Sequence, residues 1–350
     1  MKIGVYALAK NERKHVEPWA ESCREADVRV VTDTGSTDGT VEALVQQGVT
    51  VCNGYVVPWR WDDAHNLSLH HLPPDCDVAI RLDLDERLQP GWRETVERHF
   101  SAGFNNLRYR YVWSWRPDGT PDLVFHSDRV HSRHGYRWAQ ATHEGLVCWH
   151  GEQRIAMVDE GLEIHHHRDV GKRHKTDLSL LRVAVKEAPH DARVRWYLAR
   201  EMSYAGMPEA AATFAEYLRM PGGAPTERSY AMRKLWEATG VEQHLHNAAK
   251  EAPYEPDAWA ALAWCRYQQQ DWRECAGFAQ AAIDAPGPTS HATDPAVPRR
   301  AKDLLAVALW NLGKLPDALR FAREARAECP DDPRLIANVE AIERSLEAVA

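Results

Sequence analysis

The sequence predicts two domains of different class: a Rossmann-like α/β domain over residues 1–174 and an all-α helical repeat over residues 175–350. Three observations support this division. The 350 residues are enough for two domains of ordinary size. Before residue 175, apolar strand-like runs alternate with helical patterns, which is typical of βαβ units with a parallel sheet. After it, prolines and alanines recur at a fixed spacing.

Composition and charge argue against several classes of function. The net charge is −8, so neither a duplex nucleic acid nor an anionic membrane surface is an expected partner. The opening run, MKIGVYALAKNER, is too short for a secretory signal or a membrane span. The seven cysteines are scattered and form no CxxC pair, which favours a reduced, cytoplasmic protein.

Strands and helices alternate in the first half. Strands are expected over 2–9, 28–33, 49–56 and 78–85, and helices over 14–26, 40–48 and 62–72. Gly48 suits the end of the second helix as a C-cap. Ligands bind such sheets at the carboxyl ends of the strands. Chemistry is therefore expected in this half, which also holds 14 of the 18 histidines.

The second half has an internal period of 32 residues. Two sets of residues recur at this spacing: Pro189, Pro221 and Pro253, and Ala199, Ala231 and Ala263. Ala306 follows after a proline-rich insertion over 286–298. Small residues let paired helices approach closely, and Gly206 and Gly313 permit the turn within a pair. The pattern resembles tetratricopeptide repeats, with a plain helical bundle as the alternative.

Polar segments follow three of the predicted strands. They are KNE (10–12), DTGSTDGT (33–40) and DLDE (83–86). Because parallel strands end at one edge of a sheet, we expect these segments to lie together. Taken alone, DLDE could be a solvated acidic turn, and DTGSTDGT could be a helix N-cap. Three carboxylates within four positions repel one another, so something must compensate them.

Together these segments resemble the nucleotide-sugar domain of glycosyltransferase family 2, which has the GT-A fold. That family has a Lys-Asn-Glu-like segment, a D-x-G-S-x-D-G-T segment and a D-x-D segment at these strand ends. The resemblance covers residues 1 to about 175, and a repeat tail fits a known subgroup. It implies a metal-dependent, inverting hexosyltransferase that uses a nucleotide-diphosphate sugar donor, with a UDP-sugar favoured.

The resemblance also implies a metal site. Asp85 would ligate a divalent cation, Mn²⁺ or Mg²⁺, which bridges the donor diphosphate to the protein. Asp83 would contact the ribose or a metal-bound water. In LEIHHHRD (162–169), the histidine of the family's I-x-H motif aligns with His166 and would complete the site. The neighbouring His165 and His167 stay open as alternatives.

Further residues resemble the donor pocket of the family. Asp33 and Asp38 would hold the base and ribose, because a carboxylate accepts hydrogen bonds from a uracil imide or from hydroxyls. Asp38 could instead cap the helix that follows it. By resemblance Ala9, Lys10 and Asn11 line the same pocket, with Lys10 as a candidate phosphate or base contact.

One position departs from the family, and two more complete the site. His65 stands where the family usually has an arginine, so the donor's identity stays open; His65 could also be a helix-surface residue. Arg129 would stabilise the diphosphate. Glu144 is the candidate general base for the acceptor, although it could form a structural pair with His143. Glu86 would orient its neighbours or begin a helix.

The repeats suggest the kind of acceptor. Tetratricopeptide arrays form concave surfaces that commonly hold peptides, so we expect a protein or peptide glycosylated on Ser, Thr or Cys. The alternative is a non-enzymatic adaptor that carries a degenerate transferase domain. The sequence leaves the oligomeric state open, a homodimer included.

Overall fold

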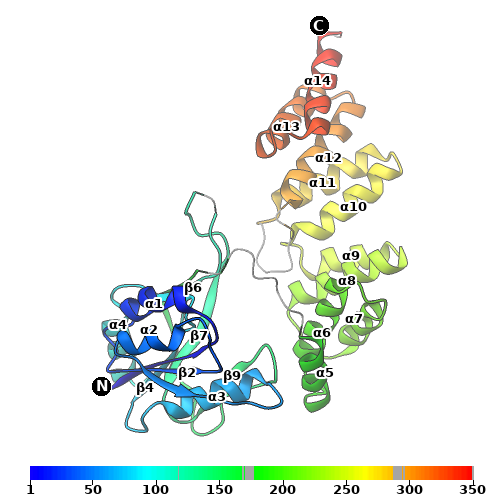
Figure 1. The fold of residues 1–350 in the computed structure, drawn as a ribbon. Coiled ribbons are helices and arrows are strands. Elements are labelled where there is room, and N and C mark those ends of the chain that lie inside the picture. Colours follow the sequence, from blue (N-terminus) through cyan, green and yellow to red (C-terminus); the bar gives the residue numbers. More distant parts are fainter. Residues whose placement is uncertain (117, 168, 170–176, 287–293, 295, 349–350) are drawn as a thin grey trace. The chain divides into compact units, whose positions relative to one another are not determined.

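Two units, Met1–Ala184 and Val185–Ala350, make up the chain (Figure 1). The computed structural model describes residues 1–350 except for 117, 168, 170–176, 287–293, 295 and 349–350. The predicted domain boundary between residues 174 and 175 lies outside the described residues. The first unit is a mixed α/β domain, and the second is an all-helical repeat region.

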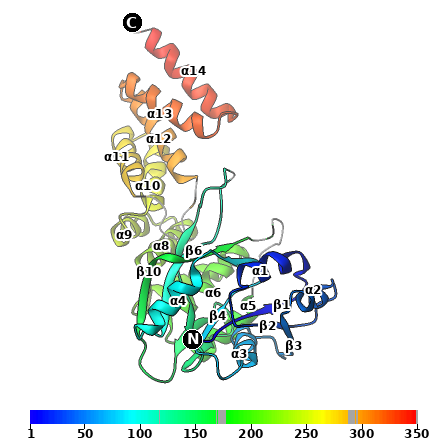
Figure 2. The ribbon, with the colours of Figure 1, turned by 90° about the vertical axis from the view of Figure 1, so that its left-hand side faces the viewer.

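Parallel strands form one half of the main sheet in the first unit. They are β1 (Ile3–Ala9), β2 (Val28–Asp33), β3 (Thr50–Asn53) and β4 (Val78–Arg81). β1 lies between β2 and β4, and β3 is the outer strand (Figure 2). All four predicted strands are present, but β3 ends at Asn53 rather than at residue 56, and β4 ends at Arg81 rather than at residue 85. β4 ends early because a turn follows, in which Glu86 N donates to Asp83 O over 2.9 Å.

The other half of the sheet corrects the expectation of a parallel sheet. Its strands are β7 (Val124–Ser132), β6 (Asn106–Val112), β10 (Ile155–His166) and β5 (Glu86–Leu88), in that spatial order. β7 is antiparallel to both β4 and β6, β10 is parallel to β6, and β5 is antiparallel to β10. β6 and β7 are consecutive and joined without a crossover, so they pair antiparallel. A separate hairpin consists of β8 (Tyr136–Ala139) and β9 (Gly145–Cys148).

Helices cover both faces of the sheet. They are α1 (Val16–Ser22), which continues the 3₁₀ turn η1 (Arg13–His15), α2 (Thr40–Gln46), α3 (Trp61–His71) and α4 (Trp92–Ser101). Successive side chains of β1 point to opposite faces of the sheet. Val5 belongs to the core that contains Trp19 of α1. Tyr6 belongs to the core that contains Leu69 of α3. Both faces of β1 are therefore buried, as expected for a central parallel strand.

The second unit consists of helices that pack with their neighbours in the chain. They are α5 (Leu178–Glu187, which begins in the first unit), α6 (Ala192–Tyr204), α7 (Ala210–Arg219), α8 (Pro225–Thr239), α9 (Gln243–Glu251), α10 (Pro256–Gln268), α11 (Trp272–Asp284), α12 (Val297–Asn311), α13 (Leu315–Glu328) and α14 (Pro333–Glu347). α6 packs on α7, α8 on α9, α10 on α11 and α12 on α13. The recurring alanines lie on the first helix of each pair and are fully buried: Ala199, Ala231, Ala263 and Ala306. This arrangement is consistent with tetratricopeptide-like helix pairs.

The turns within the pairs match the predicted glycines. Gly206 and Gly313 have φ angles of +67° and +74°, in the left-handed region that glycine enters without penalty. Gln270 occupies the corresponding turn of a third pair with φ of +57°. A side chain in this conformation costs about 1–2 kcal/mol, so this turn is more strained than the three with glycine, the third being that of Gly240 between α8 and α9, with φ of +70°. Among the described helices, none combines the length and apolar character that crossing a bilayer requires.

Replacing Ala306 by leucine should destabilise the second unit by about 1–3 kcal/mol, because a fully buried contact between paired helices has no room for three more carbons. Ala327, an exposed alanine of α13, provides the control. Ala327→Leu should change the free energy of unfolding, measured by urea denaturation, by less than about 0.5 kcal/mol. Equal losses in both variants would contradict close packing at Ala306.

Candidate active site

The three polar segments lie at one edge of the sheet. β1 pairs with β2 on one side, with Ala9 opposite Asp33, and with β4 on the other. Beyond β4, Leu82 N still donates to Tyr6 O over 3.1 Å, which carries the acidic turn alongside β1. The chain leaves β1 toward β2 and β3 and returns on its opposite side as β4. The carboxyl ends of β1 and β4 therefore flank a topological switch point, where ligands bind in sheets of this kind.

The first two segments are joined by hydrogen bonds. Asn11 N donates to Ser36 Oγ over 2.9 Å, and Thr37 N donates to Asn11 Oδ1 over 2.8 Å. Asn11 has φ of +60°, a conformation that asparagine tolerates better than most residues. Ala9 O accepts from Thr34 N over 2.9 Å, whereas Lys10 is exposed. The predicted pocket residues Ala9, Lys10 and Asn11 therefore adjoin the loop that follows β2.

Asp33 has a carboxylate oxygen without a partner. The side chain is only 5% exposed, and its Oδ2 accepts from the backbone N–H groups of Gly35 and Ser36, each over 2.9 Å. Its Oδ1 is buried and has no hydrogen-bond partner in the part of the chain that the structure describes. A buried acceptor without a partner is costly, so an N–H or O–H donor from a ligand would stabilise it.

Asp38 holds the loop that precedes α2. Its Oδ2 accepts from Arg13 N and its Oδ1 from Thr40 N, both over 3.1 Å, and Thr40 Oγ1 also donates to Oδ1. Burial acts to raise the pKa of Asp38, but these hydrogen bonds outweigh it and lower the pKa. Asp38 therefore contacts Thr40, the first residue of α2, but the N-cap residue itself is Gly39. A contact with the donor stays a prediction.

Asp83 is paired with two arginines. Arg81 donates from Nε over 3.3 Å and from Nη2 over 3.0 Å, and Arg129 Nη1 lies 3.4 Å from Asp83 Oδ2. Burial favours the neutral acid, but the two guanidinium charges outweigh it and hold the pKa of Asp83 well below its usual range. Asp83 is therefore ionised, and its repulsion from the neighbouring acids is compensated within the chain.

Glu86 is buried and holds its neighbours in place. The residue is 1% exposed. Its Oε1 accepts hydrogen bonds from Arg129 Nη1, over 2.6 Å, and from the Tyr111 hydroxyl. Its Oε2 accepts from Asp83 N over 2.9 Å. The predicted orienting role is confirmed by these contacts. A helix start is wrong, because Glu86 begins strand β5. Arg129, predicted to meet the diphosphate, is directed at the two acids instead.

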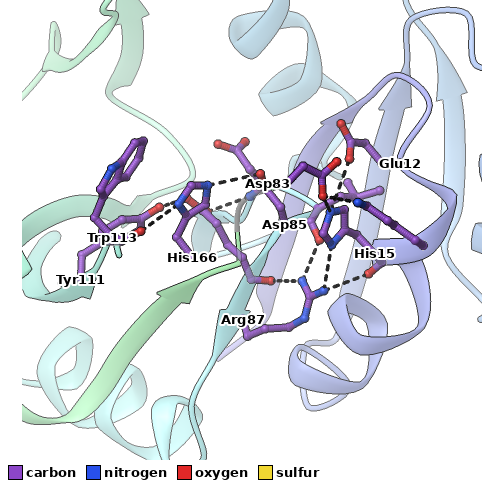
Figure 3. A network of polar contacts seen from close by, with 12 residues as sticks. Glu12, His15, Asp83, Asp85, Arg87, Tyr111, Trp113 and His166 are labelled. Atoms are coloured by element: carbon purple, nitrogen blue, oxygen red, sulfur yellow. Dashed lines mark hydrogen bonds and ion pairs between the residues drawn. The ribbon is translucent and has the colours of Figure 1, made fainter. Parts of the chain in front are cut away.

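Asp85 and His166 face one another. His166 Nε2 lies 3.2 Å from Asp85 Oδ2, and His166 Nδ1 lies 3.1 Å from Trp113 O (Figure 3). A carbonyl oxygen only accepts, so Nδ1 carries a hydrogen and Nε2 presents either a proton or a lone pair to the carboxylate. Burial lowers the pKa of His166, but the bond to Asp85 outweighs it and raises that pKa. The pair therefore requires a proton or a metal ion between its atoms.

The other two histidines of the run lie differently. Along β10 the side chains of Leu162, Ile164 and His166 are buried, because alternate residues of a strand lie on the same face. His165 Nε2 instead contacts Glu163, and His167 donates only its backbone N–H to Asp85 O, over 2.7 Å. Of the three, His166 is therefore the one whose ring meets Asp85.

Glu144 lies in a second network that joins the first through Arg81. Its Oε1 is 2.9 Å from Arg81 Nη1 and 3.2 Å from His65 Nε2, the latter contact lacking hydrogen-bond alignment. Burial would raise the pKa of Glu144, but His65 and Arg81 outweigh it and lower that pKa to about 2. A carboxylate whose pKa lies so far below neutral pH is a weak proton acceptor. His65 is 1% exposed, between the rings of Trp61 and Trp138, so it is not a helix-surface residue.

Arg81 and Arg87, which flank the acidic turn, were missed as functional residues. Arg87 Nη1 donates to Leu84 O over 2.7 Å and to Glu86 O over 2.6 Å, which holds the turn from its far side. Its Nη2 reaches His15 (Figure 3). The available signal was RLDLDER (81–87), in which an arginine stands on each side of the acids that need compensation.

A third group of potential metal ligands lies next to Arg87. Glu12, His15 and Asp169 each offer one ligand atom, and these atoms all lie within 4.8 Å of one another. Existing contacts already satisfy much of this group. His15 Nε2 is 3.0 Å from Asp169 Oδ1, and the ammonium of Lys14 also contacts Asp169. The ammonium of Lys14 already contacts Asp169, so Asp85 and His166 are the better candidates for holding a metal ion.

Comparisons with known proteins leave the family open. No family model and no curated protein matches the chain. Among solved structures, it is similar to the N-terminal domain of stress-induced protein-1 (STI-1) from C. elegans, with 19% identity over 35% of this chain and 99% of that chain and a TM-score of 0.28. A crystal structure of MamA protein has 14% identity over 43% of this chain and 79% of that chain, with a TM-score of 0.33. TTC0263, a thermophilic TPR protein in Thermus thermophilus, has 18% identity over 47% of this chain and 88% of that chain, with a TM-score of 0.32. Scores this low carry no argument, so the helical repeat rests on the helix pairs described above.

Replacing Glu86 by glutamine should lower the free energy of unfolding by about 3 kcal/mol, because it leaves the buried charge of Arg129 without its main partner. Glu163 is the matched control, since its ion pair with Arg110 is much more exposed. Glu163→Gln should cost less than about 1 kcal/mol in the same urea titration. A similar cost for both changes would argue against a structural role for Glu86.

Proposed function

We propose that the first unit is a metal-dependent, inverting glycosyltransferase that uses a nucleotide-diphosphate sugar, with a UDP-sugar favoured. One observation carries the proposal. Asp85 and His166 face one another at 3.2 Å, at the same sheet edge where Asp33 keeps a buried oxygen without a described partner. The first pair suits a cation, and the second group suits a hydrogen-bond donor of a nucleotide. Such a sugar donor brings both together with its diphosphate between them.

The residues fit a divalent cation. Asp85 and His166 would hold it, because a carboxylate oxygen and an imidazole nitrogen together suit Mn²⁺ better than Mg²⁺. The bond from His166 Nδ1 to Trp113 O orients the ring, as a second layer of contacts does at metal sites. Asp83 is held by two arginines, so it is a poorer ligand in this arrangement. When bound, the cation would neutralise charge on the departing diphosphate.

The donor's base would lie against Asp33. Its Oδ1 can accept the imide N–H of uracil, whereas the ring nitrogen of cytosine at that position has no hydrogen to donate. Asn11 and Asp38 hold the surrounding loop, and Lys10 is exposed beside it. Asp33 is therefore the residue on which we base the preference for a UDP-sugar.

The acceptor's proton would pass to Glu144. The carboxylate is ionised, so it is in the state that a base requires. While Arg81 and His65 hold it, its proton affinity is low, so those contacts must loosen as the acceptor's O–H or S–H bond breaks. The acceptor atom would then attack the anomeric carbon from the face opposite the diphosphate, which gives an inverted product.

A protein or peptide side chain is the proposed acceptor. Helical repeats of this kind present extended surfaces that suit polypeptides. Intact-mass analysis of proteins incubated with this enzyme, a UDP-sugar and Mn²⁺ would test the proposal. An added hexose mass on Ser, Thr or Cys would support it, and transfer only to lipids or free sugars would overturn it.

A non-enzymatic adaptor is the second candidate. The observation that favours it is that Asp83, Glu86 and Glu144 all have cationic partners within the chain, which an architectural network would also show. The helical repeat would then bind a partner protein while the first unit served as a support. Calorimetric titration with UDP and Mn²⁺ separates the two candidates, since an adaptor of this kind would bind neither.

Replacing Asp85 by asparagine should lower Mn²⁺ affinity and sugar transfer at least about 100-fold, because it removes the charged ligand.

In the wild type, Mn²⁺ competes with a proton on His166, whose pKa is raised. Affinity should therefore fall about tenfold per pH unit below that pKa and level off above it. Calorimetry between pH 5.5 and pH 8.5 would measure this. Mn²⁺ affinity independent of both pH and Asp85 would contradict the site.

Replacing Asp33 by asparagine should reverse the preference between nucleotides. The amide oxygen can still accept from Gly35 and Ser36, and the NH₂ group then takes the position of the unpartnered Oδ1. Affinity for UDP should fall about 10-fold or more and affinity for CDP should rise, as measured by calorimetry in the presence of Mn²⁺. Equal losses for both nucleotides would show that Asp33 does not read the base.

A further inference from the structure

Arg81 contacts two acids with two different edges of its guanidinium. Its Nε and Nη2 are 3.3 and 3.0 Å from the oxygens of Asp83, and its Nη1 is 2.9 Å from Glu144 Oε1. These acids are 61 residues apart in the sequence. Asp83 lies two positions before Asp85, the proposed metal ligand, and Glu144 is the proposed base. Arg81 itself is 6% exposed at the end of β4, so its orientation is set by protein contacts.

The plane of the guanidinium is fixed by an aromatic ring. Arg81 Cζ lies 4.6 Å from the centroid of Trp138. Trp138 Nε1 donates to the Tyr6 hydroxyl over 2.8 Å, and its backbone exchanges two hydrogen bonds of 2.9 Å with the Asn66 side chain. Contacts from Tyr6 of β1 and Asn66 of α3 therefore hold Trp138 of β8, and the ring of Trp138 in turn orients the guanidinium of Arg81.

The two acids depend on Arg81 to different degrees. Asp83 also has Arg129 at 3.4 Å, so it keeps a second cationic partner without Arg81. The charged and titratable groups that face Glu144 are Arg81 from β4 and His65 from α3, with Asp83 beyond Arg81. The pKa of His65 is lowered by burial, so this histidine is neutral near pH 7. Glu144 therefore relies on Arg81 for its permanent positive charge.

We propose that Arg81 is a positioning residue that holds Asp83 and Glu144 in one arrangement, so that the donor side and the acceptor side of the site are set by a single guanidinium. The inference rests on the proposed function for its catalytic meaning. An arginine is required because its planar fork donates along two edges at once, whereas the ammonium of a lysine is a single point of charge. Lysine at this position can hold one acid well, but it cannot hold both.

Arg81→Lys tests the proposal while keeping the charge. Transfer should fall about 100-fold, with Mn²⁺ affinity within about threefold of wild type, because Asp85 and His166 are untouched. The pKa of Glu144 should rise toward that of an ordinary carboxyl, so an acid limb should appear in the pH profile of kcat between about pH 4 and pH 6. Arg108→Gln removes an exposed arginine of β6 and should leave rate and profile unchanged. A wild-type rate and profile in Arg81→Lys would overturn the proposal.

A second measurement separates this inference from the proposed function. Unfolding of Arg81→Gln, Glu144→Gln and the double variant in urea at pH 7 forms a double-mutant cycle. Loss of stability in the double variant that is smaller than the sum of the single losses supports a direct hold of Arg81 on Glu144. Additive losses overturn it. If the wild type binds no UDP with Mn²⁺, the proposed function fails, yet the cycle still decides whether Arg81 positions Glu144.

Discussion

The first unit depends on how the chain compensates three carboxylates within four residues. Asp83, Asp85 and Glu86 follow a short buried strand, and their carboxylates lie close enough to repel one another, Glu86 being buried and the two aspartates partly exposed. The protein gives each a different partner. Asp83 has Arg81 and Arg129, Glu86 has Arg129 with the Tyr111 hydroxyl, and Asp85 has only His166 as a close side-chain partner in the described chain. A permanent charge neutralises the first two acids, whereas the partner of the third is a base that titrates.

Because their partners differ, the three acids have different chemical properties, although they look equivalent in the sequence. Asp83, paired with two arginines, stays ionised, whereas burial raises the pKa of Glu86 even beside Arg129. Their hydrogen bonds hold both acids in place, which suits a scaffold. In the proposed function Asp85 and His166 would instead exchange a proton for a metal ion, because the histidine Nδ1 donates to Trp113 O and its Nε2 is directed at the carboxylate. Glu144, like Asp83, is paired with Arg81. This arginine connects Glu144 to the acidic turn and helps to lower its pKa.

The second unit obeys a simpler constraint. Its helices pair through fully buried alanines, so the spacing of small residues along the chain sets where one helix can approach another. Glycines in the left-handed conformation, Gly206, Gly240 and Gly313, close three of the turns, and Gln270 shows that a side chain can take this place at some cost. Packing of this kind is local, because each helix mainly contacts its neighbours in the chain.

The sequence by itself determined the features that follow from local pattern. These are the first four strands, the helix pairs, and the meeting of three polar segments at one edge of the sheet. These follow from periodicity and from the rule that parallel strands end together. The resemblance placed His166 in a metal site with Asp85, and in the structure the two side chains, 81 residues apart, lie 3.2 Å from one another; metal binding stays a prediction. Only the tertiary structure decided that β6, β7, β10 and β5 complete a mixed sheet, that Arg129 faces the acids, and that Arg81 holds Glu144. Contacts between residues so far apart leave no periodic signal, because they depend on which strands become neighbours rather than on the order of residues within any one of them.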